Sequence, residues 1–133
     1  MSQMHILLLP TNGLQFTDVT APVQHVLDAW YEQSLFPGDA LCCVTMMTPD
    51  AGVIVSDVDP AGLDLGLAAG GGTRIGRLHF SLDMTELRRF FARTSEIFMV
   101  RGTTGGAVIA GARRVFLLGD GEGGKCEVAL SVL

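Results

Sequence analysis

The sequence predicts an α/β fold, in which helices cover a sheet that ends in a C-terminal β-hairpin. Several short segments are apolar at nearly every position, which is typical of strands buried on both faces. Segments with helical periodicity separate some of these strands. With 133 residues, the chain fits one domain with one core, spanning residues 1–133.

The first predicted strand covers residues 5–9, HILLL, and Pro10 ends it. A helix is predicted from Thr20, which can cap it, with Pro22 in the first turn, where a missing N–H costs nothing. Its apolar residues repeat every three or four positions and are Val23, Val26, Leu27, Trp30 and Tyr31. Its solvent-facing positions are Gln24, His25, Asp28 and Glu32.

The middle of the chain predicts two more strands and an ambiguous segment. Residues 41–48, LCCVTMMT, are followed by a turn sequence and by the apolar residues 53–55, which together predict a short hairpin. Residues 63–69 lead into Gly70, Gly71 and Gly72, and they fit either a third strand ending in a glycine loop or a weak helix.

A second helix is predicted over residues 83–93, where Asp83 and Glu86 form a capping box. Residues 97–100, IFMV, then form another buried strand. Residues 107–114, AVIAGARR, fit a helix or the return arm of a hairpin, and the final segments RVFLL and CEVALSVL predict a hairpin. If residues 98–118 form a hairpin without a helix, the fold is instead an α+β, ferredoxin-like sheet with two helices.

Composition excludes several classes of partner. The 9 Lys and Arg against 14 Asp and Glu give a net charge of −5, so the chain lacks the basic surface that nucleic acid binding requires. No apolar run reaches the roughly 18 residues of a membrane span, so no membrane association is expected. No Lys or Arg precedes the first apolar run, so we expect no signal peptide and a cytoplasmic location.

The chain is also poor in charge, because Asp, Glu, Lys and Arg make up only 17% of it while 48% is apolar. Few helices are available to cover strands that are apolar on both faces, and a bare sheet face would be a large apolar patch. The sequence therefore predicts a homodimer or a larger assembly.

Two groups of residues partly resemble cofactor sites, one for a nucleotide phosphate and one for a metal, but neither fits. Residues 119–126, GDGEGGKC, are one residue away from a phosphate-binding loop, but Cys126 lacks the hydroxyl that would bind Mg²⁺, and too little chain follows. The three cysteines and the histidines His5 and His79 lack metal-ligand spacing, so we expect reduced thiols, no metal and no cofactor.

The remaining candidate site is the segment 102–106, GTTGG, after the strand IFMV. A turn from strand to helix would expose Thr103 at a helix N-terminus, where backbone N–H groups stabilise a developing anion. The same residues also fit the turn of a glycine-rich hairpin.

The order of these segments resembles the ThiJ/PfpI superfamily, the class I glutamine amidotransferase-like fold, and in particular its isonitrile hydratases and the amidase-like domains of AraC-type regulators. The similarity covers residues 5–114. The runs that carry it are ILLLPTNGLQFTDVTAPVQHVLDA, VTMMTPDAGVIVSD, LDLGLAAGGG and IFMVRGTTGGAVIAGARR.

This resemblance implies a flavodoxin-like α/β sheet, a dimer and a Cys nucleophile on a strand-to-helix turn. Thr103 stands in place of that Cys and Thr104 follows it, while Asp18 is the implied acid or base. A threonine hydroxyl needs an adjacent base to react, so the usual chemistry is weakened.

The leading hypothesis is a divergent family member that binds a small polar molecule, with a hydratase-like or hydrolase-like activity. Thr103, Thr104 and Gly105 would orient the ligand, and Gly70, Gly71 and Gly72 would offer backbone N–H groups. The alternative is a non-catalytic oligomeric module for protein interaction or regulation.

Overall fold

The computed structural model describes residues 4–11, 16–35, 38–57, 65–67, 73–75, 78–80, 95–119 and 124–133. The elements in chain order are β1 (Met4–Pro10), β2 (Phe16–Asp18), α1 (Thr20–Glu32), β3 (Ala40–Met46), β4 (Gly52–Ser56), β5 (Leu65–Leu67), β6 (Thr73–Ile75), β7 (Leu78–Phe80), β8 (Ser95–Thr103), β9 (Gly106–Ile109), a 3₁₀ turn (Ala110–Ala112), β10 (Arg114–Leu118) and β11 (Lys125–Val132).

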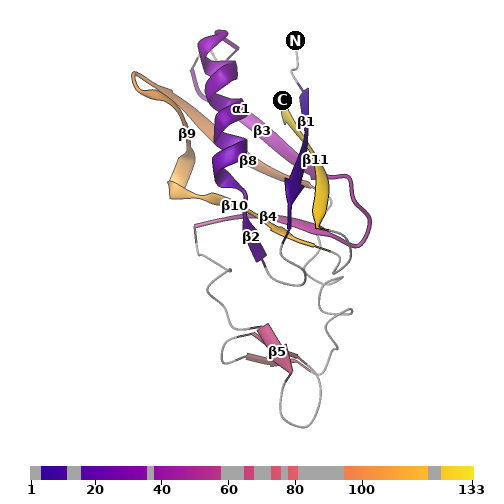
Figure 1. The fold of residues 1–133 in the computed structure, drawn as a ribbon. Helices are drawn as coiled ribbons and strands as arrows, with labels where there is room; N and C mark the ends of the chain where they lie inside the picture. Colours follow the sequence, from indigo (N-terminus) through magenta and orange to yellow (C-terminus); the bar gives the residue numbers. More distant parts are fainter. Residues whose placement is uncertain are drawn as a thin grey trace.

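The largest sheet has five antiparallel strands in the order β1-β11-β3-β8-β9. A second antiparallel sheet has the order β2-β10-β4, and a third, small sheet has the order β5-β6-β7 (Figure 1). The predicted flavodoxin-like α/β sheet is therefore wrong, and the alternative α+β class is closer to the structure.

Two predicted hairpins are also wrong, because their strands lie in different sheets. β10 pairs with β2 and β4, whereas β11 pairs with β1 and β3, so the last two strands do not form a C-terminal hairpin. In the same way β3 and β4 belong to different sheets. Strand propensity locates a strand but does not choose its partner, since a strand that enters the other sheet carries the same apolar pattern as one that pairs with its neighbour in sequence.

The main core lies between the five-stranded sheet, α1 and the three-stranded sheet of β2, β10 and β4. Alternate residues of β3, β8 and β11 point into it, among them Val44, Val100 and Val128, which are fully buried. The helix contributes its predicted stripe, in which Leu27 is fully buried and Trp30 nearly so. The periodicity of this helix was thus predicted correctly.

The opposite face of the five-stranded sheet, called the outer face below, is largely bare. Ile6 and Ile97 are 50% and 57% exposed there. The other large apolar side chains exposed on it are Met4, Leu8, Leu41, Met99 and Val108. The strands were predicted to be apolar on both faces with too few helices to cover them, and the structure does leave one face of this sheet uncovered within the chain. An apolar side chain facing a partner molecule and one facing the core look the same in sequence.

The segment after β8 is a hairpin and not a helix. β8 pairs with β9 from Val100 opposite Ile109 to Thr103 opposite Gly106, and only a 3₁₀ turn follows. The strand-to-helix turn expected at Thr103 is thus replaced by the hairpin that the same residues also allow. The predicted helix over residues 83–93 lies outside the described residues. Among the residues that are described, no helix is both long and apolar enough to cross a membrane.

Candidate functional site

The turn between β8 and β9 consists of Thr104 and Gly105, and the Thr103 side chain closes it. The Thr103 hydroxyl donates to the Gly106 carbonyl (2.8 Å) and accepts from the Gly105 N–H (3.2 Å). Gly106 has φ +128°, a backbone conformation that residues other than glycine rarely adopt. The hydroxyl of Thr103 is therefore committed to turn geometry, as both donor and acceptor.

The last turns of α1 pack beside this hairpin. The Tyr31 hydroxyl donates to the Thr103 carbonyl, and Gln24 Nε2 donates both to Asp28 Oδ1 (2.8 Å) and to the Ala107 carbonyl (2.7 Å). These bonds fix the helix to both strands of the hairpin at the end where the turn lies.

An open depression of about 310 Å³ lies between the helix and the turn. Its lining consists of Asp28, Tyr31, Glu32, Thr104, Gly105 and Gly106. Asp28 and Glu32 are four positions apart, which places both carboxylates on one side of the helix. None of these lining residues is Lys or Arg, so the depression is a negatively charged surface with backbone and hydroxyl groups on one side.

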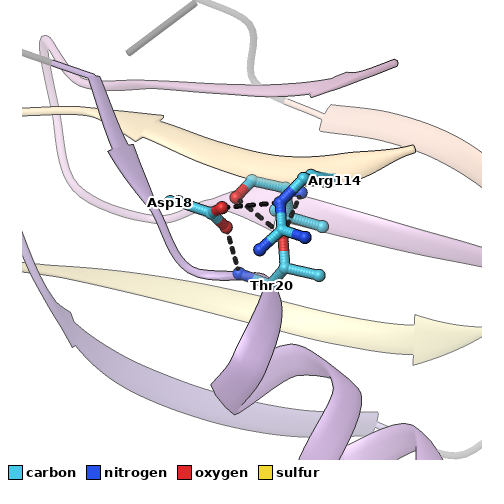
Figure 2. A network of polar contacts seen from close by, with 4 residues as sticks. Asp18, Thr20 and Arg114 are labelled. Atoms are coloured by element: carbon cyan, nitrogen blue, oxygen red, sulfur yellow. Dashed lines mark hydrogen bonds and ion pairs between the residues drawn. The ribbon is translucent and has the colours of Figure 1, made fainter. Parts of the chain in front are cut away.

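Asp18, the predicted acid or base, belongs to a different network (Figure 2). Its Oδ1 accepts from the Thr20 N–H (2.9 Å), and its Oδ2 accepts from Arg114 Nε (2.6 Å), with which it forms an ion pair. The Thr20 hydroxyl in turn accepts from the Val115 N–H (2.8 Å). Asp18 thus connects β2, the start of α1 and β10.

This network sets the protonation state of Asp18. Partial desolvation alone would raise its pKa, but hydrogen bonds from Thr20 and the hydrogen bond and charge of Arg114 outweigh it, so the pKa lies below its usual value of 3.8. An ionised carboxylate that is held by an arginine and a backbone N–H serves as a fixed acceptor. A general acid or base needs a pKa nearer to the working pH.

The two parts of the predicted catalytic group lie at opposite ends of α1. Asp18 directly precedes the helix, whereas Thr103 is bonded to Tyr31 in its last turn. Eleven residues separate Thr20 from Tyr31, which corresponds to about 16 Å along a helix. The structure therefore brings Thr104 and Gly105 together with the helix carboxylates, and it does not bring Asp18 to them.

Gly70, Gly71 and Gly72 lie outside the described residues, so the structure does not place them. Within the described ranges, no three His, Cys, Asp or Glu side chains gather as a metal site would require. Burial, and secondarily the neighbouring Cys43, raises the pKa of the Cys42 thiol to about 11, which makes it unreactive at neutral pH.

The sequence analysis placed Asp28 and Glu32 on the solvent-facing side of the helix and assigned them no role. The available signal was the position of Asp28, three residues before Tyr31 and four before Glu32, which puts it beside both an aromatic ring and a second carboxylate on one helix surface. What the sequence does not contain is the turn that faces them, because it comes from a hairpin more than 70 positions away.

Known proteins are similar to this chain in fold only. No family model matches the chain, and no curated protein matches it. Solved structures do match over nearly its whole length. A YbjQ-like protein of unknown function from Sulfolobus solfataricus P2 is 13% identical, with a TM-score of 0.61 over 99% of this chain and 96% of the other.

A hypothetical protein from Aeropyrum pernix K1 is 15% identical, with a TM-score of 0.61 over 98% of both chains. An uncharacterized conserved protein of the YjbQ/UPF0047 family from Clostridium acetobutylicum is 10% identical, with a TM-score of 0.55 over 97% of this chain and 99% of the other. At these identities the likeness establishes a shared fold and no shared activity.

These neighbours overturn the resemblance to the ThiJ/PfpI superfamily, which has a different fold. The implied isonitrile hydratase-like or hydrolase-like activity falls with it. The non-catalytic interaction module gains no specific support either, because the first of these neighbours is described only as a protein of unknown function.

Proposed function

We propose that the domain binds a small organic cation, an amine or a guanidine, in the depression between α1 and the β8–β9 turn. The observation that carries this proposal is the pair of carboxylates, Asp28 and Glu32, on one wall of a depression whose lining contains no basic residue. A cation there interacts favourably with both charges, whereas an anion is repelled.

The size and the other lining groups favour an organic ligand. A volume of about 310 Å³ lies at the lower end of the roughly 300 to 1,000 Å³ of small-molecule pockets. The Tyr31 ring is an aromatic surface that attracts a cation, and the backbone of Thr104 and Gly105 offers carbonyl acceptors for N–H donors.

The hydrogen bonds give the two carboxylates different roles. Gln24 holds one oxygen of Asp28 toward the hairpin, so this carboxylate is pre-oriented and is the principal charge partner. Glu32 is exposed at the end of the helix and adds a second, more mobile charge. The turn residues set the opposite wall.

Isothermal titration calorimetry tests the proposal, with putrescine and agmatine as cationic probes and succinate and glycerol as anionic and neutral ones. We expect binding of a cationic probe that weakens with added salt. Asp28→Asn and Glu32→Gln should each raise the Kd about 3- to 10-fold, and the double variant should raise it further, because each removes one partly exposed charge contact of about 0.7 to 1.4 kcal/mol.

Asp57→Asn is the matched control, since it removes the same charge from an exposed position just after β4, where Ser56 pairs with Arg114 near the start of α1 and away from the turn. It should leave the Kd nearly unchanged. Absence of binding by both cationic probes, or equal binding by the double variant and the unaltered protein, would refute the proposal.

A further inference from the structure

The outer face of the five-stranded sheet is apolar over most of its extent. The register places Ile6, Ala129 and Thr45 in one row across three strands, and Met4, Ser131, Cys43 and Ile97 in the next row. Side chains that are paired in an antiparallel ladder lie on the same side of the sheet. The exposed apolar side chains thus form one group along β1 and another across β3, β8 and β9, and the positions between them carry no charge and are Ala129, Ser131, Cys43 and Thr45.

The size of this face falls at the lower end of the range for stable protein interfaces. Five strands at ~4.8 Å spacing give a width of about 24 Å, and about seven residues per strand at ~3.4 Å give a similar length. The resulting flat area is roughly 600 Å², and a standard interface buries ~800 Å² of accessible surface on each partner.

The charged residues of this face lie at its two ends. Arg101, on β8, is opposite Val108 at one end, and Asp39 directly precedes β3 there. Glu127 and Lys125 lie at the other end, on β11. Each end thus carries one acid and one base, and the middle carries neither, which is a self-complementary pattern for two copies stacked with their ends exchanged.

We propose that the outer face is the dimer interface of this protein, and that a second copy covers it by sheet-on-sheet packing about a two-fold axis near Cys43. Arg101 on β8 and Glu127 on β11 flank β3, and the register places Cys43 of β3 midway between them. A two-fold axis there stacks the apolar centres on each other and brings Arg101 of each copy to Glu127 of the other.

Sedimentation equilibrium tests this in the full chain at micromolar concentrations. We expect a mass of twice the 14.1 kDa of the chain. Ile97→Asp, which would bury a charge at the centre of the interface, should raise the dimer Kd at least about 30-fold. Ala21→Asp, on the exposed surface of α1, is the control and should stay dimeric, and circular dichroism checks that both variants fold.

A charge exchange tests the orientation. Arg101→Glu alone and Glu127→Arg alone should each weaken the dimer at least about tenfold, because each places like charges opposite one another. The double variant should recover most of the loss. An increase in the labelling rate of Cys43, which is partly exposed in the single chain, should accompany dissociation on dilution.

A monomer at all concentrations overturns the proposal, and so does an assembly that Ile97→Asp leaves intact. A dimer in which the double charge variant is no tighter than either single one overturns the two-fold arrangement. These outcomes are independent of the cation-binding proposal, since the depression and the outer face share no residue.

Discussion

Thr20→Val isolates the contribution of one hydroxyl group to the joint between strand and helix. β2 pairs with β10 only from Phe116 to Leu118, and it then gives way to the helix. The next residue of β10, Val115, is paired instead by the start of α1: its carbonyl accepts from the Val19 N–H (2.9 Å), and its N–H donates to the Thr20 hydroxyl (2.8 Å). Valine keeps the shape of threonine and removes this acceptor.

The expected loss follows from the backbone group that is left behind. A buried N–H without an acceptor costs about 1 to 3 kcal/mol, and because Thr20 is half-buried we expect the lower part of this range, about 1 to 2 kcal/mol. Valine and threonine have similar helix propensities, which adds little. For a chain of this length, an unfolding entropy of about 2.1 cal/mol/K per residue converts the loss into a Tm lower by about 4 to 7 °C.

Differential scanning calorimetry together with urea unfolding measures this loss, and Thr20→Ser is the matched control because it keeps the hydroxyl. The serine variant should lose less than half as much stability as the valine variant. If the valine variant unfolds within about 0.3 kcal/mol of the original chain, or if serine is as damaging as valine, then the hydroxyl does not complete the ladder and the reasoning fails.

Three further predictions concern acid stability, the turn and the core. Because the pKa of Asp18 is lowered in the fold, its contribution to stability is complete above the unfolded pKa near 3.8 and disappears as the pH falls through the lower folded pKa. Asp18→Asn should therefore lower the stability at neutral pH. It should also flatten the acid limb of a curve of stability against pH. Gly106→Ala should cost about 1 to 3 kcal/mol in urea unfolding, because a residue with a side chain is strained at φ +128°. Gly105→Ala should cost much less, because a methyl group there would meet only Thr103 Oγ1, at 3.9 Å. Equal losses would contradict this. Leu27→Ala should cost about 2 to 5 kcal/mol in the same measurement because this side chain is fully buried, and a small loss would mean that the core refills the space.

Local pattern predicted the positions of the main elements well. The apolar run around Ile6 and the one around Phe98 are strands, and the helix begins at Thr20 as its periodicity indicates. Thr20 itself does not cap the helix, because its hydroxyl bonds across to β10 and the position before the helix is Val19. The residue type was informative, but its partner lies 95 positions away in the chain.

The fold class could not be obtained in this way, because the decisive facts are non-local. The apolar residues of both parities in β1 and β8 predict burial on two faces, and the structure exposes one of them, as at Met4 and Ile97. The runs HILLL and IFMV would be equally apolar whether a helix of the same chain or a second molecule covered these strands. The predicted α/β sheet with covering helices followed from that ambiguity, whereas the family resemblance rested on the order of the segments.

Two of the residues predicted for the site, Thr104 and Gly105, line the depression, whereas the carboxylates that line it were assigned no role from the sequence. Thr104 and Gly105 were selected because glycine-rich turns present backbone groups, and they do line a depression. The expected partner, Asp18, is held by Arg114 at the far end of the helix, and the carboxylate beside the turn is Asp28. Which acid meets the turn depends on the length and docking of α1, not on local sequence.

The pairing of β1 with β11 affects how the chain folds during its synthesis. Met4 is opposite Ser131 and Pro10 is opposite Lys125, so the neighbour of β1 in the sheet is a strand that is synthesised more than 110 residues later. Contacts between such distant segments are entropically costly to close and slow to form. Until Lys125–Val132 leaves the ribosome, the apolar segment of β1 is unpaired, and at this stage a nascent chain is most dependent on chaperones.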